Sequence, residues 1–144
     1  MRGLALEAAA AAAARGEVPV GAVIVSAGGR VLAVAGNRMR ELSDPTAHAE
    51  MLAMRAAAAR IGSERLIDAD LHVTLEPCTM CAGAISFARI RRLYFAAADE
   101  KGGAVEHGCR FFHQPTCHHA PEVYGGIREV AAAELLRAFF AGRR

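Results

Sequence analysis

The sequence has little of what marks membrane, secreted and strongly nucleic-acid-binding proteins. No stretch approaches the roughly 20 apolar residues of a membrane span, and the formal net charge is only +2. The four cysteines lack the spacing of a small secreted disulfide framework, which favours a reducing, cytoplasmic location. Any interaction with nucleic acid must therefore be argued from where individual charges lie, because the overall charge does not indicate one.

Tryptophan is absent and aromatic residues are few, yet hydrophobic residues make up 53% of the 144-residue chain, largely through alanine. This is enough for one core, and we expect a single domain over residues 1–144. The alanine run at 8–14 follows Glu7 and is only weakly apolar. We therefore expect a surface helix there rather than a signal peptide.

The expected secondary structure alternates between strands and helices. In chain order, the expected elements are a helix at 4–15, strands at 21–25 and 31–34, a helix from 44 to about 60, a strand at 71–75, a helix from 77, a strand at 93–96, a loop at 99–119, a strand at 122–124 and a helix at 127–142. This order predicts an α/β fold, a three-layer sandwich around a partly parallel sheet.

Two short motifs carry candidate chemistry. His48 and Glu50 form an H-x-E sequence, and Cys78 and Cys81 form C-x-x-C directly after Pro77. One imidazole and two thiols give three zinc ligands, whereas a structural zinc normally takes four and a catalytic zinc takes three plus water. The ligand count therefore favours a catalytic zinc, with Glu50 beside it as an acid/base group.

Each motif alone has a simpler explanation. An H-x-E sequence is common by chance, and a C-x-x-C sequence is also typical of redox sites and of half a structural zinc site. The two motifs together are more specific, because both are expected at helix starts, where the helix dipole favours thiolates. A zinc held there lowers the pKa of its water to about 7.

These motifs and their flanking stretches resemble the zinc-dependent cytidine/adenosine deaminase superfamily, and within it the branch that acts on adenosine in tRNA. The resemblance covers nearly the whole chain and implies a cytidine-deaminase-like fold with a five-stranded mixed sheet. The stretches that carry it are residues 17–22, 36–38, 44–50, 75–83 and 135–144.

The resemblance implies that His48, Cys78 and Cys81 hold one Zn²⁺ per subunit and that Glu50 shuttles protons. The family reaction is hydrolytic deamination of adenosine to inosine at the tRNA wobble position: zinc-bound hydroxide attacks C6, and ammonia leaves. A nearly unpaired anticodon-loop base costs little to extrude. The implied partners are a tRNA anticodon stem-loop and a second copy in a homodimer. The implied substrate contacts are Val18, Asn37, Ala49, Asp99, Phe139, Phe140, Arg143 and Arg144.

The carboxyl-terminal segment supports RNA binding only in part. Arg137, Arg143 and Arg144 accompany Phe139 and Phe140, and basic groups with aromatics suit phosphate contact and base stacking. Without the resemblance, a solvated charged face with packed aromatics is the simpler interpretation.

The loop at 99–119 departs from the commonest family pattern. Residues 105–112 stand where many members have a small Gly-Ser segment, and Cys109, Cys117, His118 and His119 raise the question of a second metal site. Their spacing matches no zinc template, so we expect ordinary loop residues. Two other functions stay open: a deaminase of a free base or nucleoside, such as guanine or cytidine, and a zinc-stabilised RNA-binding module without catalysis.

Overall fold

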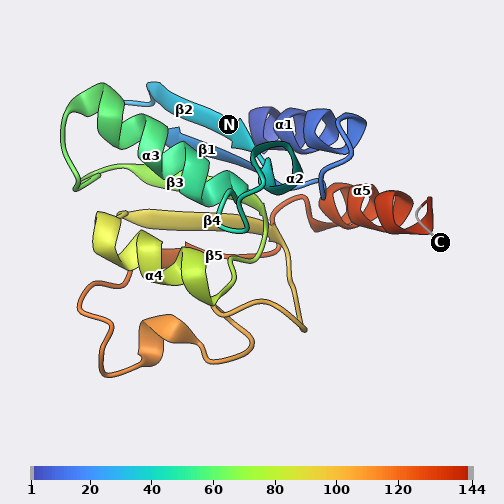
Figure 1. Ribbon diagram of the computed structural model, residues 1–144. Coiled ribbons are helices and arrows are strands. Elements are labelled where there is room, and N and C mark those ends of the chain that lie inside the picture. Colours follow the sequence, from blue (N-terminus) through green and yellow to red (C-terminus); the bar gives the residue numbers. More distant parts are fainter. Residues whose placement is uncertain (1, 143–144) are drawn as a thin grey trace.

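The hairpin expected near the amino terminus lies at one edge of a five-stranded sheet in the computed structural model, which describes residues 2–142 (Figure 1). The elements are α1 (Arg2–Ala14), β1 (Gly21–Val25), β2 (Val31–Gly36), α2 (Met39–Leu42), α3 (Ala49–Ile61), β3 (Asp70–Leu75), α4 (Thr79–Ala88), β4 (Arg92–Ala97), the 3₁₀ turn η1 (Phe111–His113), β5 (Glu122–Tyr124) and α5 (Glu129–Ala141).

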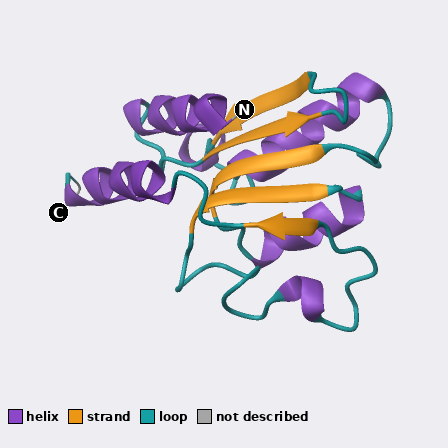
Figure 2. Cartoon of the chain, turned by 180° about the vertical axis from the view of Figure 1, so that it is seen from behind, coloured by secondary structure: helices purple, strands orange, loops and turns teal. Residues whose placement is uncertain are grey.

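The sheet is mixed, with strand order β2-β1-β3-β4-β5. β1 is antiparallel to β2 and β3, whereas β3, β4 and β5 are parallel. Helices α3 and α4 cover one face, and α1 and α5 lie against the other (Figures 1 and 2). The predicted three-layer sandwich with a five-stranded mixed sheet is confirmed.

The main core lies between the sheet and the α3–α4 layer. Alternation along each strand sends Ile24, Leu71 and Phe95 to this face, where each is almost fully buried. Val23 and Val25 point the other way and pack with Ala5 of α1. The parallel strands β3 and β4 end at Leu75 and Ala97. The loops that follow them therefore leave the sheet at the same edge, the carboxyl ends of the strands, where ligands bind in open α/β sheets.

Helix α1 approaches the hairpin unusually closely. Gly21 and Gly36 face each other across β1 and β2. A Cβ on Gly21 would lie 2.0 Å from the carbonyl oxygen of Ala5, and one on Gly36 would lie 2.8 Å from that of Ala8. The backbone of α1 therefore lies almost in contact with the backbone of the hairpin, and only side chains as small as alanine fit on this face of the helix.

Three rings form a ladder across the parallel strands on the α1–α5 side. His72 stacks on Tyr94 with ring centroids 4.5 Å apart, and Tyr94 stacks on Tyr124 at 5.1 Å. α1 and α5 lie toward one end of this face (Figure 2). Cross-strand ring pairs of this kind stabilise the sheet.

The predicted helix start at residue 44 is wrong. The Oδ1 atom of Asp44 accepts hydrogen bonds from the backbone N–H and the hydroxyl of Thr46, at 2.8 and 2.7 Å. The carboxylate therefore closes a tight turn two residues on instead of capping a helix. Helix α3 begins five residues later, at Ala49, and the extra short helix α2 precedes this turn. Across residues 2–142, no helix has both the length and the apolar character needed to cross a membrane.

Candidate active site

Helix α3 begins at the site because a distant side chain caps it. Oδ1 of Asn37 accepts a hydrogen bond from the backbone N–H of Ala49 at 2.8 Å, and Nδ2 of Asn37 donates one to the carbonyl oxygen of Val18 at 3.0 Å. The His48 side chain makes no cap bond of its own. Asn37 thus joins the loop before β1 to the start of α3 and leaves the imidazole of His48 free to turn toward the cysteines.

Helix α4 brings the two thiols to the same point. Cys78 is its N-cap residue and Cys81 lies in its first turn. The Nδ1 atom of His48 lies 3.7 Å from Sγ of Cys78 and 3.6 Å from Sγ of Cys81, and the three ligand atoms lie within 4.8 Å of one another. Zinc–sulfur and zinc–nitrogen bond lengths at a tetrahedral angle place sulfur and nitrogen about 3.6 Å apart. The donor set therefore fits a zinc ion.

Polar contacts within the triad favour the thiolate form of one cysteine. A hydrogen bond from Cys81, assisted by one from His48, lowers the pKa of Cys78 to about 4. The same bond to Cys78, together with burial, raises the pKa of Cys81. The hydrogen bond to Cys78 raises the pKa of His48. Two helix amino termini converge here, and their dipoles add to this preference for negative charge.

Glu50 lies in the first turn of α3 and its side chain is buried. Burial raises the pKa of Glu50 to about 7. A carboxyl group with a pKa near neutrality both accepts and donates a proton readily at physiological pH, which is the property required of a general acid/base. Its neighbours include the thiol of Cys81, with which it shares a hydrogen bond.

A cavity of about 180 Å³ opens over these groups. The structure brings six of the predicted site residues together in its lining, which consists of Val18, Val20, Asn37, Met39, His48, Glu50, Leu75, Glu76, Cys78, Asp99 and Gly102. Cys81 is buried and is not part of this lining, and the N–H of Ala49 is held by Asn37. The substrate-contact roles assigned from sequence stay predictions, although the positions converge.

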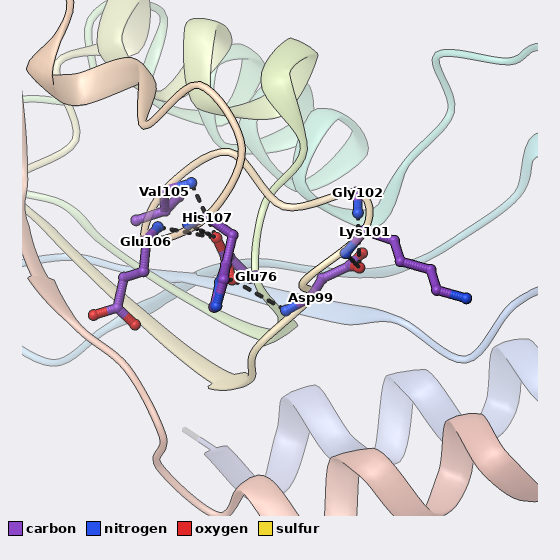
Figure 3. Close-up of polar contacts among 7 residues, drawn as sticks. All are labelled: Glu76, Asp99, Lys101, Gly102, Val105, Glu106 and His107. Carbon is purple, nitrogen blue, oxygen red and sulfur yellow. Dashed lines mark hydrogen bonds and ion pairs between the residues drawn. The ribbon is translucent and has the colours of Figure 1, made fainter.

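One wall of the cavity is organised by Glu76, the last residue before Pro77. Figure 3 shows its carboxylate surrounded by the loop that follows β4. Oε1 accepts hydrogen bonds from the backbone N–H of Asp99 at 3.0 Å and from Nδ1 of His107 at 2.8 Å. Oε2 accepts three more, from the backbone N–H groups of Val105, Glu106 and His107 at 3.1, 2.9 and 3.0 Å.

These five donors outweigh the cost of burying the carboxylate. Burial acts to raise the pKa of Glu76, but the hydrogen bonds from the Asp99 backbone and from His107 leave that pKa lowered. Glu76 is therefore a charged structural anchor. For Glu76, its place directly before the P-C-x-x-C motif was the available signal. Five cavity residues were not predicted from sequence: Val20, Met39, Leu75, Glu76 and Gly102.

Other predicted site residues lie away from the cavity. Phe139 lines a separate groove between α1 and α5, and Phe140 on the same helix is 54% exposed. Arg143 and Arg144 fall outside the described residues. The RNA contacts assigned to these four residues stay predictions, because a large substrate reaches beyond the cavity.

The cysteines and histidines of the long loop do not gather around a point. Cys109 is exposed, with Sγ 3.9 Å from the hydroxyl of Thr79. Cys117 contacts the hydroxyl of Ser86, and His119 contacts the carbonyl oxygen of Ile90. Over residues 2–142, the triad of His48, Cys78 and Cys81 is the single metal-ligand cluster found, which supports the interpretation as loop residues.

Comparison with protein families gives a match over residues 1–97 to the family described as the cytidine and deoxycytidylate deaminase zinc-binding region. The matched segment contains the whole triad, and His48, Cys78 and Cys81 are the zinc ligands. The tRNA-specific adenosine deaminase of Agrobacterium fabrum is 64% identical over 98% of this chain and 92% of its own length. The enzyme of the same name from Haemophilus influenzae is 46% identical over 97% of this chain and 81% of its own.

Solved structures give the same picture. One, from biochemical and structural studies of A-to-I editing by tRNA:A34 deaminases at the wobble position, has a TM-score of 0.91 and 64% identity, covering 93% of this chain and 96% of that chain. A guanine deaminase from Nitrosomonas europaea has a TM-score of 0.79 and 26% identity, covering 97% of this chain and 82% of that chain.

Proposed function

The chain belongs to the cytidine and deoxycytidylate deaminase family, and we propose that it is the zinc-dependent hydrolase that converts adenosine to inosine at the wobble position, A34, of tRNA. The observation that carries the proposal is a small cavity that holds three zinc ligands and a buried glutamate. Relatives similar over nearly the whole chain are tRNA-specific adenosine deaminases. Residues 1–144 act as one catalytic domain.

Zinc, when bound by His48, Cys78 and Cys81, supplies an activated water at neutral pH. The chain's own groups handle the protons. The carboxylate of Glu50 accepts one proton from the water, holds it in a buried position and gives it to the departing exocyclic nitrogen. Water adds at C6, its second proton ends on N1 of the purine, the C6–N bond breaks and ammonia leaves, so adenosine becomes inosine. A pKa near 7 suits both halves of this transfer.

The cavity determines how much of the substrate enters. A volume of about 180 Å³ admits a base but not a folded RNA loop, so the nucleotide must turn out of its loop. Val18 and the amide of Asn37 flank the base from one side, and Asp99 flanks the nucleotide from the other. Both Oδ1 and one N–H of Asn37 are engaged within the protein, which leaves the second N–H of Nδ2 to contact the base.

The remainder of the RNA contacts the carboxyl-terminal helix in this proposal. Phe139, Phe140, Arg143 and Arg144 supply ring faces and positive charge beside the anticodon stem-loop. Deleting residues 137–144 should abolish activity on the stem-loop while zinc content stays at one per chain. Unchanged activity on RNA would show that this segment does not contribute to binding.

We propose that the enzyme acts as a homodimer through the α3–α4 face. A groove lined by Met51, Met54 and Phe87 runs between these two helices, and Phe87 is 81% exposed. An exposed aromatic ring beside a groove of mixed apolar and charged lining suits an interface, and it lies on the helices that carry the zinc ligands, so one RNA can contact both subunits. Sedimentation should give a dimer for the wild type and a monomer for Phe87→Glu.

The enzyme is proposed to work in the cytoplasm. All four cysteines are free thiols, and two of them must remain unoxidised to hold zinc. A reducing compartment preserves them, and tRNA is processed there. Tagging the protein and fractionating cells tests this location directly.

One deamination assay tests the proposed function. Zinc-loaded protein is mixed separately with an anticodon stem-loop carrying A at the wobble position, with guanine and with cytidine. We expect inosine in the RNA and no reaction with the small molecules. If guanine or cytidine releases ammonia and the RNA stays unreacted, the zinc mechanism would stand but the proposed RNA substrate would be wrong.

A further inference from the structure

The loop at 99–107 forms one wall of the cavity and is held mainly by a single carboxylate. Asp99 and Gly102 line the cavity, and the carboxylate of Asp99 accepts hydrogen bonds from the backbone N–H groups of Lys101 and Gly102, at 3.2 and 2.9 Å. The N–H of Asp99 in turn donates to Glu76. The position of this wall therefore depends on where the Glu76 carboxylate is held.

His107 supplies the one side-chain donor among the five groups that surround Glu76. Its Nδ1 donates to Oε1, the same oxygen that receives the N–H of Asp99. The other three donors, all backbone N–H groups, meet Oε2. Removing the imidazole therefore leaves Oε1 with the Asp99 bond alone, so the position of this oxygen, and with it that of Asp99, is less firmly held.

Close packing makes this arrangement sensitive to small changes. A Cβ on Gly103 would lie 2.5 Å from Cδ of Glu76 and 2.5 Å from the carbonyl oxygen of Asp99. The loop backbone thus lies directly against the carboxylate, with no room for a side chain between them. Figure 3 shows His107 and Asp99 on either side of Glu76.

We propose that His107 is a positioning residue for substrate binding, which acts through Glu76 to hold Asp99 and Gly102 in place at the cavity wall. This inference rests on the proposed function. The imidazole of His107 bonds to Glu76 rather than to a zinc ligand or to Glu50, so its role concerns how the extruded nucleotide is held and not how protons move. His107 does not line the cavity itself, whereas Glu76 does.

The test compares the steady-state kinetics of His107→Leu with the wild type on the anticodon stem-loop. We expect KM to rise about tenfold, the effect of losing one charge-assisted hydrogen bond, with kcat within about twofold and zinc unchanged at one per chain. His107→Asn keeps an N–H donor at the same distance from the backbone, and we expect it to restore KM. The matched control is His118→Leu, since His118 is exposed on the same loop.

Three results would overturn the positioning role: an unchanged KM in His107→Leu, a fall in kcat with KM unchanged, or a loss of zinc. Failure of His107→Asn to restore KM would also overturn it. The wild-type enzyme tests the proposed function separately. If the wild type deaminates guanine and not RNA, the proposed function is wrong. The positioning role is then tested by measuring KM for guanine in the same variants, because Asp99 and Gly102 line the cavity for either substrate.

Discussion

Two buried glutamates line the same cavity and have opposite surroundings. Glu50 is 4% exposed and Glu76 is 2% exposed. Burial raises the pKa of Glu50 to about 7, whereas hydrogen bonds from the backbone and from His107 leave the pKa of Glu76 lowered in spite of burial. The difference shows that burial alone does not decide what a carboxylate does; the number of donors around it does.

The two residues consequently contribute to different properties. Glu50 has few donors and can change its protonation state during a reaction. Glu76 has five donors and must remain charged to satisfy them. Catalysis should therefore depend on Glu50 and stability on Glu76, and the following predictions test that separation.

Glu50→Gln has the largest expected effect. It removes the proton carrier but keeps the shape, so turnover should fall on the order of a thousandfold or more. Zinc content and the midpoint of thermal unfolding should match the wild type, because no backbone donor from another part of the chain loses its partner. Turnover, zinc content and unfolding are measured on one preparation, with the exposed Glu134→Gln as control. Retained turnover would remove Glu50 from the mechanism.

Glu76→Gln should lower stability more than turnover, the reverse of Glu50→Gln. The amide group presents an N–H to a cluster of N–H donors, and we expect the free energy of unfolding to fall by about 3 kcal/mol. Turnover per folded, zinc-loaded molecule should fall less than in Glu50→Gln. Denaturant unfolding measures the change, and Glu122→Gln is the control because it breaks the exposed pair with Arg92, which contributes little. Equal stability of Glu76→Gln and the wild type would contradict the anchor role.

The contribution of His107 to stability should depend on pH. Its hydrogen bond to Glu76 and the charge of that carboxylate, followed by the charges of Glu100 and Glu106, raise the pKa of His107. A raised folded-state pKa stabilises the fold fully below the unfolded value of about 6.5 and loses this effect as pH rises through the folded-state pKa. The stability difference between the wild type and His107→Asn should therefore shrink from pH 6 to pH 9. A difference that grows with pH would reverse the assigned sign.

Replacing both Cys109 and Cys117 with Ser has the smallest expected effect. Neither lies in the zinc triad, so zinc should stay at one per chain and turnover should match the wild type. Cys81→Ser, by contrast, should lose zinc. Metal analysis after gel filtration separates the two cases, and a lower zinc content in the double variant would establish a second site on the loop that Glu76 holds.

The parts of the site that depend on local patterns could be predicted from sequence. The H-x-E and P-C-x-x-C motifs gave the zinc ligands, and strand-helix alternation gave the sheet with its layers. The start of α3 was misplaced because Asp44 is a good capping residue in sequence, yet its carboxylate closes a turn with Thr46. The true cap, Asn37, lies 12 residues before Ala49, and no local rule connects the two.

Glu76 was missed for the same reason. Four of its five donors come from residues 29 to 31 positions away along the chain. A single glutamate beside a proline does not predict such partners. Long-range polar contacts of this type arise from the tertiary fold, whereas sequence patterns report mainly periodicity, turns and ligand spacing.

The glycine pair under α1 explains why the first fourteen residues are so rich in alanine. A larger side chain at Ala5 or Ala9, or any side chain at Gly21, would lift the helix from the hairpin. The guanidinium of Arg15, just after the helix, donates to the carbonyl oxygen of Asn37, so lifting would also disturb the residue that caps α3. Substitutions in this helix are therefore constrained jointly: a larger side chain on its inner face affects the hairpin and, through Arg15 and Asn37, the start of the helix that bears Glu50.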